Sequence, residues 1–175
     1  MGQGLADWMK ERYDAEITWA PFDLHPEYPP EGVPRPPSTG EMEARFAESG
    51  LVYNPPPIRA NSLKALRLAE HARAHDLFPQ LHARLMDAYW AEAQNIGDSD
   101  VLRTLAEEIG LGGTDEILES DAYLDVVHAS TAQAVAAGVT GVPAFVLDQR
   151  MLVLGAHPRT TFERAFAQLD SGRSA

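Results

Sequence analysis

Apolar residues recur at helical spacing over most of the chain. Leu5, Trp8, Met9 and Tyr13 form one such stripe, which predicts a helix over residues 3–13. The same spacing predicts further helices, whose stripes are, in chain order, Leu63 and Leu66; Leu81, Leu85, Ala88 and Tyr89; Val101, Leu102, Leu105, Ala106 and Ile109; Leu124, Val127, Thr131 and Val135; and Phe162, Ala165, Phe166 and Leu169. Most of the predicted structure is therefore helical.

Three short apolar runs are typical of β-strands. Residues 17–20 form the first run, which Pro21 ends. Residues 143–147 and 151–154 form the other two, and the polar turn between them predicts a hairpin.

Prolines divide the first third of the chain. Seven of them lie within residues 21–40, where fixed φ angles forbid a regular helix and predict an extended loop. A short helix is expected at residues 41–49, and Asn54 with the three prolines after it predicts a rigid turn. The predicted architecture is α/β, with a frame made of residues 1–40 and 138–175 and an all-helical insertion at residues 41–137.

The composition is that of a folded, acidic protein. Hydrophobic residues make up 45% of the chain, charged residues make up 23%, and the net charge is -12. The acidic balance argues against a nucleic-acid partner, because phosphate contacts need clustered Lys and Arg. No run of 18 apolar residues predicts a membrane span, and the first 20 residues lack the apolar core of a signal peptide. We expect a cytoplasmic protein.

The most specific string is Gly-Val-Thr-Gly-Val-Pro-Ala-Phe-Val at residues 138–146. Thr140 and Gly141 are expected to form a turn before Pro143, which begins an apolar strand although it supplies no ladder donor. A cis Val142–Pro143 bond explains this position, and so does a trans proline at the start of a strand. In the cis case, the backbone N–H and C=O of Val142 are free to pair with an extended substrate.

Four segments in the same order resemble the DsbA family, and most closely its FrnE-like branch. The first is GVTGVPAFVL with the helix GAHPRTTFERAF that follows its hairpin. The second runs from Trp19 to Pro26 and is similar to W-x-P-F-x-L-x-P, and the third runs from Asn61 to Leu68 and is similar to N-[ST]-x-x-A-x-x-L. The fourth runs from Ala88 to Asp98 and is similar to A-Y-F-x-E-x-x-D-I-G-D. This branch is related to 2-hydroxychromene-2-carboxylate isomerase and kappa-class glutathione transferase. The resemblance covers nearly the whole chain.

The resemblance implies a thioredoxin-like fold with an inserted helical subdomain. It also implies thiol–disulfide exchange with a protein or peptide substrate, at a C-x-x-C pair that begins the first helix. Thr140, Gly141, Val142 and Pro143 match the cis-proline loop that faces this pair, so they are the expected substrate-binding residues. No cofactor is implied by this reading, whereas the isomerase and transferase relatives use glutathione.

This sequence departs from the family pattern, because it contains no cysteine. The strand expected before the first helix is also missing, so the strands at residues 17–20 and 143–147 lose a shared partner and expose ladder groups. A truncated or misassigned start explains this, and so does a natural cysteine-free variant. We expect a homo-oligomer that borrows a strand, or else a partly molten chain.

Two further polar residues are candidates for substrate binding. His25 lies in the proline-rich loop with Asp23 and Glu27, where it is either a loop histidine or a residue that faces the substrate. Asn61 either caps a helix or contributes to a site, as an Asn at the matching motif does in the isomerase and transferase relatives.

Other chemical patterns favour structural roles. His71 and His75 have i, i+4 spacing but lack a matching third ligand, and their charged neighbours suggest a solvated face, so no metal is expected. The glycine-rich segment 110–114 follows no strand and predicts a turn between helices. Trp8, Trp19, Tyr89 and Trp90 are expected to be core aromatics.

Three functions are therefore kept open. The chain is a DsbA-like oxidoreductase that lacks its redox cysteines and is inactive in this form, a glutathione-dependent isomerase or transferase relative, or a cysteine-free thioredoxin fold that binds peptides.

Overall fold

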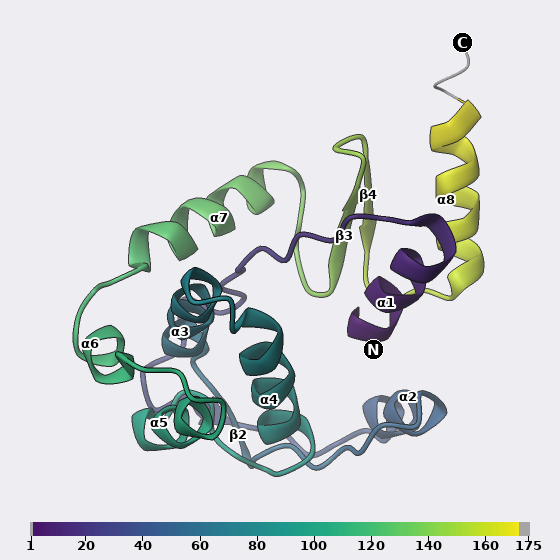
Figure 1. Ribbon diagram of the computed structural model, residues 1–175. Helices are drawn as coiled ribbons and strands as arrows, with labels where there is room; N and C mark the ends of the chain where they lie inside the picture. The colour runs from purple at the N-terminus through teal and green to yellow at the C-terminus, as the bar shows by residue number, and fades with distance from the viewer. Residues whose placement is uncertain (1, 172–175) are drawn as a thin grey trace. The chain divides into compact units, whose positions relative to one another are not determined.

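The structure is a computed structural model that describes residues 2–171 (Figure 1). Its helices are α1 (Gly2–Tyr13), α2 (Glu41–Glu48), α3 (Leu63–Ala74), α4 (Phe78–Trp90), α5 (Ser99–Glu108), α6 (Thr114–Glu119), α7 (Leu124–Ala136) and α8 (Arg159–Ser171). Its strands are β1 (Val33–Pro34), β2 (Ile58–Arg59), β3 (Ala144–Leu147) and β4 (Met151–Leu154). The chain divides into two compact units, the terminal unit (Met1–Ala20 and Ala132–Ala175) and the central unit (Pro21–Thr131).

The core of the terminal unit lies between the β3–β4 hairpin and the helices α1 and α8. The strands pair antiparallel, from Ala144 opposite Leu154 to Leu147 opposite Met151, which confirms the predicted hairpin. Figure 1 shows α1 and α8 side by side next to this hairpin. The buried side chains of the core are Met9, Leu147, Val153, Phe162, Ala165 and Leu169.

The strand predicted at residues 17–20 is wrong, because no strand is assigned to this segment. Residues from Tyr13 to Ala20 nevertheless alternate between half-buried and exposed, as in an extended chain with one face on a core. Ala15 and Ile17 pack against the terminal core. The apolar pattern therefore gives an extended segment, but in the described part of the chain this segment has no neighbouring strand with which to form a ladder.

Helices α3 to α6 enclose the core of the central unit. Their buried side chains include Leu68 and Ala72 on α3, Leu81 and Leu85 on α4, Leu102 and Leu105 on α5, and Ile117 and Leu118 on α6. The side chain of Asp98 accepts hydrogen bonds from the backbone N–H groups of Asp100 and Val101 and begins α5 as predicted. The apolar stripes of α3, α4 and α5 thus meet in one core.

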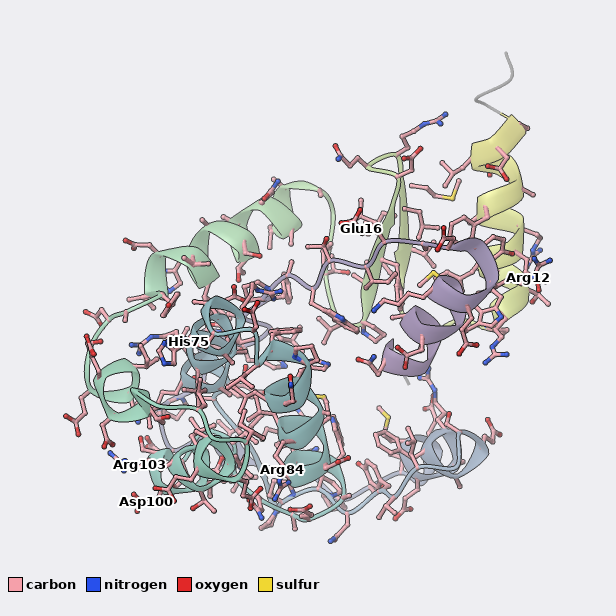
Figure 2. All side chains as sticks on the ribbon, in the orientation of Figure 1. Arg12, Glu16, His75, Arg84, Asp100 and Arg103 are labelled. Atoms are coloured by element: carbon pink, nitrogen blue, oxygen red, sulfur yellow. The ribbon has the colours of Figure 1, made fainter. Side chains whose placement is uncertain are left out.

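Arginine side chains connect the outer surfaces of these helices (Figure 2). The guanidinium of Arg103 on α5 donates to the carboxylate of Asp100 at 2.7 Å and to that of Asp115 at 2.6 Å. Because Asp115 belongs to α6, the second bond joins α5 to α6. Arg84 on α4 bonds Glu92 at 2.8 Å and also contacts Glu108 of α5. Exposed ion pairs of this kind contribute little stability singly, so packing remains the main source of stability.

A small ladder forms where the sequence predicted only a loop and a rigid turn. β1 pairs antiparallel with β2, with Val33 opposite Arg59 and Pro34 opposite Ile58. The backbone N–H of Arg35 extends the pairing with a 2.8 Å bond to the carbonyl of Pro57. Two-residue strands that contain proline have no detectable alternation, so the pattern of apolar residues could not reveal them.

The stripe predicted for α7 is only partly buried. Val127 is fully buried, whereas Val135 is 58% exposed in the same helix. The helix is present as predicted, but its apolar stripe does not form one continuous buried face. The C-terminal half of α7 leaves an apolar side chain in water, because no described element covers it.

Candidate functional site

The loop at residues 140–143 presents unpaired backbone groups. Thr140, Gly141 and Val142 make no hydrogen bond with any other residue in the described part of the chain. The Val142 side chain is 56% exposed. The Val142–Pro143 peptide bond is cis, and the carbonyl of Pro143 accepts a 2.7 Å hydrogen bond from Gly155. The loop is thus held at its end while its first three residues face solvent with free donors and acceptors.

The first turn of α1 lies directly against this loop. A Cβ atom added to Gly2 would lie 3.2 Å from the Cβ of Pro143, which is closer than ordinary van der Waals contact. No acidic side chain occupies the first turn of α1. Because the first N–H groups of a helix have no intrahelical partner, a second set of donors lies next to the loop.

The β3–β4 hairpin adds an apolar surface and an open edge. Val146 is 56% exposed and Leu154 is 38% exposed. Ala144 pairs with Leu154, and Val146 lies two residues along β3, so these side chains share one face of the hairpin. Within residues 2–171, β3 pairs with β4 alone, so the second edge of β3 has no partner strand.

His25 and Asn61 lie together in the central unit, on either side of Tyr28. The rings of His25 and Tyr28 stack with centroids 4.2 Å apart and planes within 4° of parallel. The Asn61 amide donates a 2.7 Å hydrogen bond to the carbonyl of Tyr28, and its oxygen accepts one from the N–H of Leu63. Both ends of the Asn61 side chain are therefore engaged in local structure at the start of α3.

The acidic neighbours of His25 differ in environment. The Nδ1 atom of His25 lies 2.9 Å from a carboxylate oxygen of the exposed Glu27. The pKa of Glu27 is lowered mainly by a hydrogen bond from its own backbone N–H, and to a smaller extent by the bond to His25. Asp23 is only 6% exposed, and its burial raises its pKa above the ordinary value of 3.8. The backbone N–H of His25 and the positive charge of His128 oppose this rise without cancelling it.

Substitution of Asp23 with Asn is expected to change the pH dependence of stability. Because the folded state raises the pKa of Asp23, this carboxyl stabilises most at pH values below 3.8, and the contribution is lost as the pH rises through the folded pKa. Asn does not ionise, so the unfolding free energy of Asp23→Asn should rise relative to that of the wild type as the pH increases from 3.8 through the folded pKa of Asp23.

Urea titrations at several pH values would measure this difference. Asp87→Asn, a substitution at an exposed position on α4, is the matched control for the removal of one carboxylate. Identical pH profiles for Asp23→Asn and Asp87→Asn would contradict the assignment of Asp23 as a carboxyl destabilised by burial.

His71 on α3 and His75, the residue that follows α3, each lie within hydrogen-bonding distance of a backbone carbonyl (Figure 2 labels His75). His71 is 8% exposed, and its Nε2 lies 2.8 Å from the carbonyl of Gly112. The Nδ1 of His75 lies 2.9 Å from the carbonyl of His71. The expectation of a solvated face is wrong for His71 and Glu70, which are buried, whereas His75 and Asp76 are exposed as expected. The turn before α6 packs on His71, because Gly113 lies next to its ring. No group of three or more ligating side chains is placed to hold a metal ion within residues 2–171.

Comparison with known proteins identifies the family. The family model described as a DSBA-like thioredoxin domain matches residues 3–167. The chain belongs to this family. It is also 30% identical over 165 residues to the uncharacterized protein YwbO of Bacillus subtilis, covering 88% of this chain and 82% of that protein.

Two solved structures have the same fold as this DsbA-like chain. A probable DsbA oxidoreductase from Streptomyces coelicolor matches with a TM-score of 0.84 and 26% identity, covering 95% of this chain and 82% of that one. A 2-hydroxychromene-2-carboxylate isomerase matches with a TM-score of 0.70 and 18% identity, covering 99% of this chain and 90% of that one. The fold is therefore thioredoxin-like, α/β and rich in helix, as the sequence predicted.

The DsbA-like chain contains its predicted site residues in two separate groups. Residues 140–143 lie in the terminal unit, whereas His25 and Asn61 lie in the central unit. Sequence reasoning missed Tyr28, which connects His25 to Asn61, and the burial of Asp23. An aromatic residue three positions after His25 is a weak signal. Asp23 contacts a residue far along the chain, because its backbone N–H donates to the Thr131 hydroxyl. No helix within the described residues is long and apolar enough to cross a membrane.

Proposed function

We propose that this DsbA-like chain binds an extended segment of a protein or peptide thiol or disulfide substrate. The segment lies along residues 140–142 and the open edge of β3. The observation that carries the proposal is the free backbone of Thr140, Gly141 and Val142 beside the exposed Val142 side chain.

Backbone pairing is the physical basis of this binding. Unpaired N–H and C=O groups next to a strand edge favour the addition of an extended peptide, which satisfies them without reading its sequence. The exposed side chains of Val142 and Val146 supply apolar contacts to the same segment. Such a surface suits unfolded substrates of varied sequence, which is what a thiol–disulfide oxidoreductase meets.

The exchange step itself needs a thiolate. Disulfide exchange proceeds through attack of a thiolate on a disulfide sulfur and a mixed-disulfide intermediate. This chain has no cysteine, so it supplies neither the attacking sulfur nor the mixed disulfide. We therefore propose that the chain in this form binds substrate without exchanging its disulfides.

The glutathione-dependent alternative has less support in the structure. It relied on Asn61 as a site residue, and both ends of that side chain already bond to Tyr28 and Leu63. We therefore propose no glutathione site.

Substitution of Val142 with Asp is expected to weaken peptide binding about tenfold, because it replaces an apolar contact with a charge that must be desolvated. Fluorescence anisotropy with a labelled, cysteine-alkylated insulin B chain measures the affinity. Val126→Asp on α7 is the matched control, because Val126 is 46% exposed but lies in the central unit. Equal affinities for Val142→Asp and Val126→Asp would reject residues 140–143 as the binding surface.

A second assay separates binding from exchange. Insulin reduction by dithiothreitol should proceed no faster with the pure chain than without it. Faster reduction would contradict the absence of exchange while leaving the peptide-binding result unaffected.

A further inference from the structure

A pocket of about 240 Å³ lies in the central unit. We call it the Trp90 pocket. Its walls are Arg35, residues 36–39, Met42, Tyr53, Arg59 and Trp90. It is formed by the end of α4, the β1–β2 ladder, the proline-rich segment that follows β1, and the start of α2. Nothing in the proposed function uses these residues.

Two guanidinium groups line the Trp90 pocket. Arg35 lies opposite Pro57, and Arg59 lies opposite Val33, so the antiparallel register places Arg35 and Arg59 diagonally on one face of the ladder. Two like charges in such positions repel each other. An anion bound between them would relieve this repulsion.

Neither arginine has a carboxylate partner among residues 2–171. Arg35 donates to the carbonyls of Pro56 and Ile58 and, at 2.5 Å, to the hydroxyl of Tyr89, all of which are neutral acceptors. Arg59 is exposed, and its side chain makes no hydrogen bond or ion pair with the described residues. In a chain with 26 acidic and 14 basic residues, two neighbouring arginines without acidic partners form an unusual local positive charge.

Aromatic rings form the other wall. The rings of Tyr53 and Trp90 are stacked with centroids 6.0 Å apart. The ring of Phe46 lies next to that of Trp90, with centroids 5.2 Å apart. The backbone N–H of Asn54 donates to the Trp90 carbonyl at 2.6 Å and holds the Tyr53 segment on α4. Trp90 is half-buried and lines the pocket, so it departs from the prediction of a core aromatic. Tyr89 packs against the central core as predicted, and both rings also contact the Arg35 guanidinium.

We propose that the Trp90 pocket binds a small aromatic carboxylate. The ring lies against Trp90 and Tyr53, and the carboxylate accepts hydrogen bonds from Arg59 and from the free side of Arg35. Arg59, which has no other partner among the described residues, is able to bind the carboxylate in a bidentate manner, whereas Arg35 has only its Nη1 group left to donate. A cavity of about 150 Å³ holds benzene, so a pocket of this size suits a ligand with one or two fused rings rather than a polypeptide segment.

Isothermal titration with 1-naphthoate tests this site, with the neutral 1-naphthamide as the matched ligand. Saturable binding of 1-naphthoate is expected, and 1-naphthamide should bind about tenfold more weakly because it lacks the charge. Arg59→Gln should weaken 1-naphthoate binding about tenfold, whereas Arg164→Gln on α8 should leave it unchanged. Because Arg59 is exposed, Arg59→Gln is expected to fold, and a thermal melt checks this.

Trp90→Phe provides a second variant that keeps a ring but reduces the stacking area. It should weaken 1-naphthoate binding and 1-naphthamide binding by similar factors. The proposal is overturned if 1-naphthoate shows no saturable binding, if the two ligands bind equally, or if Arg59→Gln binds 1-naphthoate as tightly as the wild type.

Discussion

Replacement of Arg67 with Met is expected to lower the free energy of unfolding by about 3–5 kcal/mol. Arg67 on α3 is only 5% exposed. Its guanidinium donates to the carbonyls of Ala122 at 2.7 Å and Ile117 at 2.5 Å, and also to that of Ser120. Met fills similar space but donates nothing, so one carbonyl within α6 and two in the segment that follows it lose their partner.

Two features make this arginine important to the central unit. Its burial lowers its pKa, and the nearby charge of Asp121 only partly opposes that effect. The carbonyls at the end of α6 carry partial negative charge, so they favour a cation at this place.

Urea unfolding followed by tryptophan fluorescence measures the loss. Arg67→Lys is the informative control, because it keeps the charge but cannot bond several carbonyls at once, and an intermediate loss is expected. A loss below about 1 kcal/mol for Arg67→Met would show that water replaces the guanidinium at these carbonyls without difficulty.

Phe162→Ala is expected to lower the free energy of unfolding by about 3–5 kcal/mol. Phe162 on α8 is fully buried in the terminal core and meets Phe145 of β3 edge to face, with centroids 5.0 Å apart. Removing its ring leaves a cavity beside β3. Because β3 directly follows residues 140–143, the same substitution should also weaken peptide binding.

Phe166→Ala is the matched control on the same helix. Phe166 is half-buried and stacks on Tyr13 with centroids 4.1 Å apart, so its loss should be smaller. Chemical denaturation measures both variants. An equal loss of stability at the two positions would contradict the placement of Phe162 at the centre of the terminal core.

The sequence predicted the long elements well, because a buried helix face leaves a regular apolar spacing. The stripe of Leu81, Leu85 and Ala88 is buried in α4, and Asp98 begins α5. Features that depend on distant partners were not predictable in this way. The ladder between β1 and β2 joins residues about 25 positions apart and contains proline, and residues 17–20 kept their alternation without forming a ladder.

The features of the candidate sites also divide into those that a local sequence pattern predicts and those that depend on contacts with distant residues. Residues 140–143 were predicted from a proline before an apolar strand and from the resemblance to the family's cis-proline loop, and their role in binding stays a prediction. The bond of Arg35 to the Tyr89 hydroxyl and the bond of the Asp23 backbone N–H to the Thr131 hydroxyl are contacts across more than 50 residues, so no local pattern shows them. The face of His71 and Glu70 was misjudged because charged neighbours suggested solvent where α6 and its turn pack.

The central claim is that residues 140–142 and the edge of β3 bind an extended polypeptide. Hydrogen-exchange mass spectrometry with and without the cysteine-alkylated insulin B chain tests it most directly. Amide exchange in the segment 139–147 should slow when the peptide is bound, because the free N–H groups of residues 140–142 become paired, while exchange in α3 and α4 should not change. Unchanged exchange in residues 139–147 at saturating peptide would contradict the proposed function.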